Sequence, residues 1–221
     1  MSSTDDTTVA TPSDERREEL AERFRSDLGE ALVATFIRPG DDLWLRVRTD
    51  AWRTLAESSR HRMGFEYFCY LSAMDWMPSP YGRGEDDPTE PPQERPTAVV
   101  QGYTGGDTRF QLLARLYDVR NHVGITLKAD VPNATMAMDT WVPVYAGASW
   151  HERETWEMFG ITFDGHPDLR HIYLPGDFEG FPLRKDFPLV ARMVKPWPGI
   201  VDVEPMPGET EGEPDEEGAA S

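Results

Sequence analysis

Residues 150–161, WHERETWEMFGI, place a histidine and several charged side chains inside a frame of aromatic residues, a composition compatible with a metal site or a catalytic carboxylate. His151 and Glu154 are spaced i, i+3, which puts both on one face of a helix. Di-iron sites in helical bundles use the opposite order, Glu-x-x-His, from two helices with two further glutamates. His166 follows within GHPDLR, a turn sequence in which a histidine typically makes local hydrogen bonds. The spacing therefore does not favour a metal site.

A glutamate of this stretch could serve in catalysis if the neighbouring tryptophans raised its pKa by excluding water. The chain, however, has no GxSxG motif and no Cys/His arrangement to complete a catalytic constellation. The structural alternative pairs Arg153 with Glu157, which are spaced i, i+4 on the same helix. It also pairs Glu152 and Glu154 with a base from the following segment: Arg170, Arg184 or Lys185. We favour ion pairing and expect no catalytic residue in this chain.

Residues 182–189, PLRKDFPL, form the basic spot of an acidic chain, and their prolines hold the backbone extended. Arg184 is suited to bidentate pairing with a carboxylate. Leu183 and Phe187 beside it make a solvated charged turn the weaker interpretation. Buried ion pairs of this kind usually fix a register or the geometry of an interface. We therefore hypothesise an ionic frame that holds this segment and a partner: Glu152, Arg153, Glu154, Arg184, Lys185 and Asp186.

The charge of the chain excludes several classes of partner. Its 221 residues carry a formal net charge of −18, and residues 202–221 contain eight acids and no base. An acidic surface does not favour nucleic acid or direct adsorption to anionic lipid. The N-terminal stretch lacks the apolar region of a signal peptide, and no segment has the roughly 20 apolar residues of a membrane span. We expect the protein to meet a membrane only through a complex.

Cysteine and glycine usage bears on cofactors. The single cysteine, Cys69, cannot form an intramolecular disulfide or supply a four-thiolate iron–sulfur cluster or a cysteine-based zinc site. It lies in the apolar run FEYFCYLSAM, which favours a small buried hydrophobe. Neither GxGxxG nor GxxxxGK[ST] occurs in the chain. We expect no cofactor to be bound by this chain.

Hydrophobic periodicity predicts an α+β fold: a small, mostly antiparallel sheet with flanking helices, followed by a long extended C-terminal docking arm. Leu20, Phe24 and Leu28 recur at helical spacing. A second helix is expected between the N-cap Asp50 and the stop Gly64. Strands are expected at 42–48, 65–76, 97–103, 109–119 and 122–130, with a hairpin turn at 104–107. Two short helices, with a break at 143–147, are expected after residue 131.

We divide the chain into four parts. These are a disordered acidic N-terminus (1–14), an α+β domain (15–149) interrupted by a proline-rich loop (77–97), a signature helix with the extended docking arm (150–200), and a disordered acidic tail (201–221). The arm has no periodicity but is rich in aromatic and aliphatic residues. At about 25 cal/mol per Å² of apolar surface, leaving these side chains in water would be costly. The arm is therefore expected to wrap over a surface, such as that of a partner.

Residues 152–189, ERETWEMFGITFDGHPDLRHIYLPGDFEGFPLRKDFPL, resemble the signature region of the C-type subunit of the respiratory NADH:quinone oxidoreductase (complex I), which is the 30 kDa subunit of mitochondria. A weaker resemblance extends back to about residue 41. The chain departs from the family in His171, where an arginine is common, in its long loop and in its acidic tail. The candidate interface and structural residues are Glu152, Arg153, Glu154, Glu157, Phe159, His166, Pro167, Arg170, Pro182, Leu183, Arg184, Lys185, Asp186, Phe187 and Pro188.

The resemblance implies a non-catalytic scaffold subunit in the peripheral arm of a proton-translocating NADH:quinone oxidoreductase. It would pack against the D-type subunit, here called the quinone-site subunit, and lie near cluster-bearing subunits on the cytoplasmic side of the cell membrane. FMN and iron–sulfur clusters would lie in partner subunits, and quinone would be the substrate of the complex. The alternative is the equivalent subunit of a related membrane-bound hydrogenase or F420H2 dehydrogenase. An independent acidic binding module or enzyme is the alternative of a different class.

Overall fold

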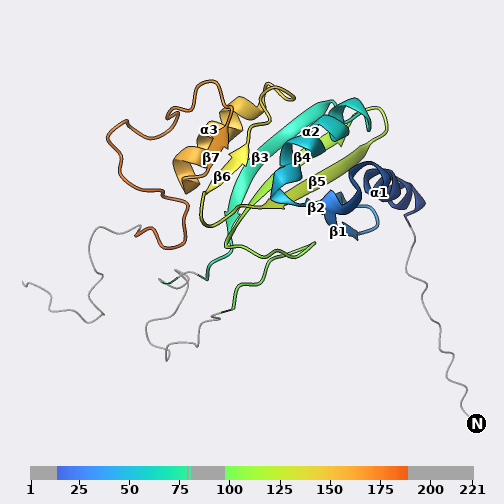
Figure 1. Ribbon diagram of the computed structural model, residues 1–221, viewed down its shortest axis with the longest axis horizontal. Coiled ribbons are helices and arrows are strands. Elements are labelled where there is room, and N and C mark those ends of the chain that lie inside the picture. Colours follow the sequence, from blue (N-terminus) through green and yellow to red (C-terminus); the bar gives the residue numbers. More distant parts are fainter. Residues whose placement is uncertain (1–13, 79, 81–97, 189–221) are drawn as a thin grey trace, which may run out of the picture.

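The computed structural model describes residues 14–78, 80 and 98–188, which form an α+β fold around a five-stranded sheet (Figure 1). The strand order is β1-β2-β5-β4-β3. In chain order the strands span Leu32–Ile37 (β1), Leu43–Val47 (β2), Tyr67–Asp75 (β3), Phe110–Asp118 (β4) and Val123–Asp130 (β5). The β2–β5 pair is parallel, and the other neighbouring pairs are antiparallel. The predicted α+β class, with a mostly antiparallel sheet and flanking helices, is confirmed. The predicted N-terminal segment, most of the proline-rich loop and the acidic tail lie outside the described residues.

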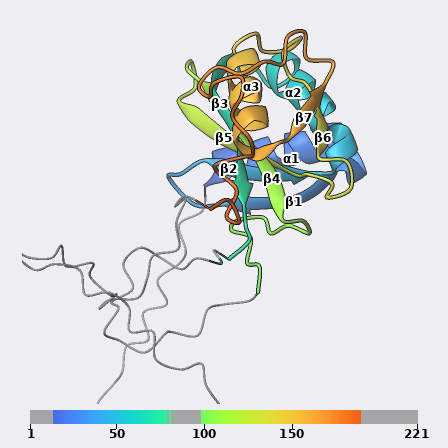
Figure 2. The same ribbon diagram turned by 90° about the vertical axis from the view of Figure 1, so that its left-hand side faces the viewer.

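Helices α1 (Glu15–Leu28) and α2 (Trp52–His61) share one hydrophobic core with the sheet. The alternation in β2 puts Leu43 and Leu45 in this core at 0% exposure, while Trp44 faces the other way. Trp52 of α2 is also 0% exposed and stacks on Trp141, with 4.4 Å between ring centroids. Full burial of a leucine contributes about 1.5–3 kcal/mol. This packing fixes α1 and α2 on the sheet (Figure 2).

Local sequence explains where the helices begin and end. Asp14 caps α1, because its carboxylate accepts a backbone N–H of the first helical turn at 3.3 Å. The predicted N-cap of α2 is wrong: Asp50 pairs with Arg48 instead, and one turn of 3-10 helix, Thr49–Ala51, leads into α2. Gly64 has a φ of +85° in the turn that follows α2, in keeping with the predicted stop.

The strand predicted at 97–103 and its hairpin are wrong, because residues 98–103 do not extend the ladder of the sheet. Tyr103 stacks on Phe36 of β1, with 4.3 Å between ring centroids. Lys128 of β5 is 1% exposed and donates hydrogen bonds to the carbonyl oxygens of Tyr103 and Gly105, each at 2.9 Å. Side-chain contacts therefore hold the segment on the sheet where a backbone ladder was expected.

The chain after β5 forms α3 (Ala148–Phe159), flanked by the short parallel strands β6 (Ala137–Asp139) and β7 (Thr162–Asp164). The first of the two predicted short helices is therefore wrong, since β6 and turns occupy its place. Helix α3 packs against the edge strand β3. That strand is less buried than its apolar run predicted, with Tyr67 58% exposed, and Cys69 is half-buried beside the Arg115 guanidinium at 3.4 Å.

The chain after β7 runs without regular structure to residue 188, where the described part ends. Figure 1 shows it as an open loop beside α3. We call residues 165–188 the arm. The rest of the predicted arm, to residue 200, lies outside the described residues. Among the described helices, none combines the length and the apolar character needed to cross a bilayer.

Candidate functional site

The buried carboxylate of Glu157 on α3 binds the backbone of the arm. Glu157 is 1% exposed. Its oxygens accept the backbone N–H groups of Ile172, Tyr173 and Leu174 at 2.5–3.3 Å and lie 3.0 Å from His171 Nδ1. Burial alone would raise the pKa of Glu157, but these hydrogen bonds outweigh it and hold the pKa below its ordinary value. A carboxylate anion is thus the attachment point of this part of the arm.

Arg153, one turn before Glu157, holds the same part of the arm through its carbonyl groups. Its guanidinium donates to the carbonyl oxygens of Arg170 at 3.0 Å and His171 at 3.1 Å. It also lies 5.1 Å from the centroid of the Trp150 ring. The predicted ion pair between Arg153 and Glu157 is wrong, because both side chains bind main-chain groups of the arm. A segment without a ladder of its own needs such partners for its buried N–H and C=O groups.

Glu152 lies on the inward side of α3 and is 0% exposed. The Thr140 hydroxyl donates to one carboxylate oxygen at 2.5 Å, and the backbone N–H of Trp141 donates to the other at 2.6 Å. Burial raises the pKa of Glu152 to about 7, although both hydrogen bonds oppose this rise. The predicted pairing of Glu152 and Glu154 with bases of the arm is wrong, since neither forms an ion pair with any residue that the structure describes.

The last turn of α3 binds the PLRKDFP motif of the arm. Arg184 Nε donates to the carbonyl oxygen of Phe159 at 2.6 Å, and the backbone N–H of Leu183 donates to that of Met158 at 3.2 Å. These carbonyls lie at a helix C-terminus, where a cation is favoured. The guanidinium also lies 4.3 Å from the centroid of the Phe181 ring. Within the described part of the chain Arg184 has no ion pair, so the predicted ionic frame is wrong at this position.

Gly160 permits this close approach, and replacing it tests the packing. Its φ is +74°, and a Cβ there would lie 2.5 Å from a guanidinium nitrogen of Arg184 and 2.7 Å from the Phe181 ring. Gly64 has a similar φ of +85° but open space around such a Cβ. We expect Gly160→Ala to lower the free energy of unfolding in urea by about 2–3 kcal/mol, and Gly64→Ala by about 1 kcal/mol, because only the first adds a clash. Equal losses in the two variants would contradict the packing of the arm on α3.

A second attachment joins the arm to the end of β3. Arg109 donates to both oxygens of Asp75, at 2.9 and 2.6 Å, and to both oxygens of Asp186, at 3.0 and 2.8 Å. The backbone N–H of Lys185 donates to Asp75 at 2.8 Å. Burial would raise the pKa of Asp75, but Arg109 and two backbone N–H groups hold it below its ordinary value. Sequence reasoning missed Asp75 and Arg109, although a charge at the end of each apolar run was a usable signal.

The remaining candidate residues have local or surface roles. His166 behaves as a turn histidine: its Nδ1 accepts the backbone N–H of Asp168 at 3.0 Å, and its Nε2 lies 3.3 Å from the Ser149 hydroxyl. Phe159 is buried and Phe187 half-buried. Half-buried or exposed on the arm are Pro167, Arg170, Pro182, Leu183, Lys185 and Pro188. Within the described ranges, no group of three or more His, Cys, Asp or Glu side chains is placed to hold a metal ion.

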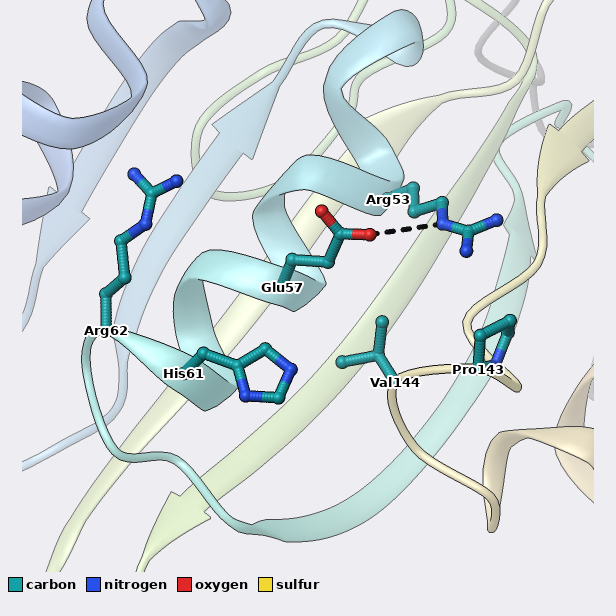
Figure 3. Close-up of a pocket in the computed structure, with 6 residues that line it drawn as sticks. All are labelled: Arg53, Glu57, His61, Arg62, Pro143 and Val144. Atoms are coloured by element: carbon teal, nitrogen blue, oxygen red, sulfur yellow. Dashed lines mark hydrogen bonds and ion pairs between the residues drawn. The ribbon is translucent and has the colours of Figure 1, made fainter.

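A surface pocket of about 320 Å³ lies beside α2 (Figure 3). Its lining residues are Arg53, Glu57, His61, Arg62, Pro143 and Val144. Arg53 donates to Glu57 at 3.3 Å, and Arg62 pairs with Asp27. Both guanidinium groups are thus engaged by carboxylates, and the six lining residues include no nucleophile.

Two solved structures share this fold. A chain of the membrane-bound sulfane sulfur reductase, an archaeal respiratory membrane complex, superposes with a TM-score of 0.59 at 20% identity, covering 80% of this chain and 88% of that chain. The trypsin-resistant fragment (1–134) of Nqo5 superposes with a TM-score of 0.50 at 19% identity, covering 70% of this chain and 99% of that fragment. At such identities the likeness shows the fold alone.

Sequence comparison identifies relatives and a family. The C/D subunit of NADH-quinone oxidoreductase from Photorhabdus laumondii is 40% identical over 104 residues, which are 47% of this chain and 17% of that protein. The protein of the same name from Klebsiella pneumoniae is 43% identical over 88 residues, 40% of this chain and 15% of that protein. The chain thus spans less than a fifth of these curated relatives. Residues 45–193 match the model of a family described as the respiratory-chain NADH dehydrogenase 30 kDa subunit. The chain therefore belongs to the family of the 30 kDa subunit of respiratory-chain NADH dehydrogenase.

Proposed function

We propose that this chain is a non-catalytic scaffold subunit of the peripheral arm of a proton-translocating NADH:quinone oxidoreductase. In this role it packs against the quinone-site subunit and supports electron transfer from NADH to quinone. The observation that carries the proposal is the name of the relatives: the C/D subunit is a single chain, and the region similar to this protein occupies 17% of the Photorhabdus example. A covalent union of the C-type and D-type subunits in relatives supports direct packing of their counterparts.

The geometry of the site supports a docking role over a chemical one. Glu157 and Arg153 bind main-chain groups of the arm, and Arg184 binds the last turn of α3. Glu152 is enclosed by a hydroxyl and a backbone N–H. The charged side chains that were candidates for catalysis therefore form hydrogen bonds within the protein, and most of these bonds hold the arm.

Within this proposal the cofactors belong to partner subunits. FMN and iron–sulfur clusters lie in the neighbouring subunits, and quinone is the substrate of the whole complex. The lone Cys69 supports this division, because a cluster normally needs four thiolates. The chain contacts chiefly the quinone-site subunit and nearby cluster-bearing subunits, and it reaches the cytoplasmic face of the cell membrane through them. Oxidoreductase and translocase activity belongs to the assembled complex.

The proposal is tested by affinity purification of the tagged full-length chain from gently solubilised membranes, followed by mass spectrometry and an NADH–quinone assay. We expect the quinone-site subunit and the flavin- and cluster-bearing subunits to co-purify, with activity that quinone-site inhibitors block. Co-purification with a nickel–iron hydrogenase subunit or with F420H2 dehydrogenase subunits would assign the chain to the alternative complexes. Recovery of the chain alone would contradict both assignments.

Arg184→Ala gives a prediction that separates assembly from chemistry. Removing the guanidinium leaves the carbonyl oxygen of Phe159 without its hydrogen bond to the arm, a charge-assisted bond worth about 1.5–3 kcal/mol. We expect about tenfold less assembled complex on native gels, with near-normal NADH–quinone turnover per assembled complex. Arg38→Ala is the matched control, because Arg38 is an exposed arginine in a surface pair. Full assembly with slow turnover would instead indicate a direct role in catalysis.

A further inference from the structure

The arm and the start of α3 leave three large apolar side chains in water. Trp150 is 64% exposed, Tyr173 65% and Leu183 52%. A single exposed apolar residue is ordinary, but several gathered on one side of a protein are typical of an interaction site. We call Trp150, Tyr173 and Leu183 the docking face.

Contacts with α3 hold the chain in place at each residue of the docking face. Trp150 packs on the guanidinium of Arg153, which also binds the arm backbone just before Tyr173. Glu157 accepts the backbone N–H of Tyr173 itself at 3.1 Å. The backbone N–H of Leu183 donates to the last turn of α3 at 3.2 Å. The docking face therefore follows α3 and the arm bound to it, which Figure 1 shows next to each other.

The docking face is held in position by the rest of the protein. Glu157 fixes the arm at Tyr173, and Arg184 fixes it beside Leu183. Asp75, buried at the end of β3, accepts the backbone N–H two residues after Leu183. Holding a surface in its bound conformation reduces the entropy lost on association. This arrangement suits a rigid surface that receives a partner.

The arm has more exposed acids than exposed bases. Three acids between β7 and the PLRKDFP motif are exposed, namely Asp168, Asp177 and Glu179, and Asp164 at the end of β7 is exposed as well. Of the two exposed bases of the arm, Arg170 and Lys185, the first is paired with Asp168 at 2.9 Å. Complementary charge across an interface steers association and suppresses wrong partners. The matching surface is therefore apolar at its centre and basic at its edge.

We infer that Trp150, Tyr173 and Leu183 are the anchors of the interface, and that they insert into an apolar depression with a basic rim on the quinone-site subunit. The inference rests on the proposed function. It assigns the partner contacts to the exposed apolar side chains. The charged residues of the signature region, Glu157, Arg153 and Arg184, hold the arm in place and do not themselves contact the partner.

The test measures the Kd between the full-length chain and the quinone-site subunit encoded by the same genome, by surface-based interferometry. Tyr173→Ser and Leu183→Ser are compared with Val33→Ser and Val119→Ser, which replace apolar residues of similar exposure, 46% and 57%, on β1 and after β4. We expect the docking-face variants to bind at least about tenfold more weakly, as for truncated interface anchors, and the controls to stay within about twofold. Circular dichroism and melting temperature check that each variant is folded.

The outcomes separate the two proposals. If the quinone-site subunit fails to bind the wild-type chain, the proposed function and the docking face both fail. If it binds wild type and the docking-face variants equally, the docking face is wrong while the proposed function stands. Weaker binding by Val33→Ser or Val119→Ser alone would also overturn the docking face. If a variant folds poorly, the test uses hydrogen exchange of the wild-type chain with and without the quinone-site subunit. The subunit must slow the exchange of the amides of residues 172–174 and 183, and must leave the exchange of the β1 amides unchanged.

Discussion

Replacing Glu157 with alanine should release residues 171–174 from α3 and leave the sheet folded. The change removes the acceptor of three backbone N–H groups, and a hydrogen bond to a charged group contributes about 1.5–3 kcal/mol. We expect the free energy of local opening at Ile172–Leu174 to fall by about 3–5 kcal/mol in native-state hydrogen exchange. Amides of β4 and β5 belong to the core and should keep their protection.

Glu154→Ala is the matched control for this prediction. Glu154 lies on the same helix, is half-buried and, in the part of the chain that the structure describes, forms no ion pair. Its removal should change the protection of the arm by less than about 0.5 kcal/mol, as for other surface substitutions. If the amides of Ile172–Leu174 exchange as slowly in Glu157→Ala as in wild type, the carboxylate does not hold the arm.

Acid should weaken the same attachment. The pKa of Glu157 in the folded protein lies below its ordinary value of 4.5. A group whose folded-state pKa is depressed contributes stability that is present above the ordinary pKa and is lost as pH falls through the folded one. Arm protection in wild type should therefore be constant from neutral pH to about pH 5 and fall below it. Glu157→Gln should start from weaker protection and show little of this acid dependence.

The sequence predicted a strand well where buried apolar residues on one face alternate with less buried residues on the other. In β2, Leu43 and Leu45 alternate with Trp44 and Arg46, and the leucines are buried as the pattern indicated. Strand β1, LVATFI, has no such alternation and was not predicted. Residues 97–103 have strand-like composition, but residues 98–103 do not join the ladder, and Tyr103 contacts the buried Lys128 and the Phe36 ring instead. Such tertiary competition is invisible to a local pattern.

The contacts of the candidate residues differ from those that the sequence predicted. The hypothesis paired acids with bases, whereas Glu157, Arg153 and Arg184 bind backbone groups. An arm without regular structure carries main-chain donors and acceptors that need partners, and the nearest charged side chains supply them. The Asp75–Arg109 pair joins residues 34 positions apart, so only the folded sheet reveals it. The residue types therefore indicated an ordered charged site, and the fold decided which groups they bind.

Glu152→Gln should stabilise the protein above neutral pH and leave it nearly unchanged in acid. Burial raises the pKa of Glu152 from 4.5 to about 7, so the folded state holds this proton more tightly than the unfolded state does. The resulting stability is fully present below about pH 4.5 and is lost as pH rises through about 7. At 1.36 kcal/mol per pKa unit, the loss is on the order of 3 kcal/mol. Glutamine keeps the shape of the protonated acid, with a carbonyl for the N–H of Trp141 and an amide N–H for the Thr140 hydroxyl.

The measurement is urea denaturation of wild type and Glu152→Gln at pH 4, 6 and 8, with Glu154→Gln as the control on the same helix. The advantage of Glu152→Gln should grow with pH and reach on the order of 3 kcal/mol at pH 8, while Glu154→Gln stays within about 0.5 kcal/mol of wild type throughout. The titration of Glu157 does not affect the difference in free energy of unfolding between wild type and Glu152→Gln, because both proteins retain Glu157. A Glu152→Gln protein that is less stable than wild type at pH 8 would show that the hydrogen bonds from Thr140 and Trp141 outweigh burial and keep the carboxylate ionised.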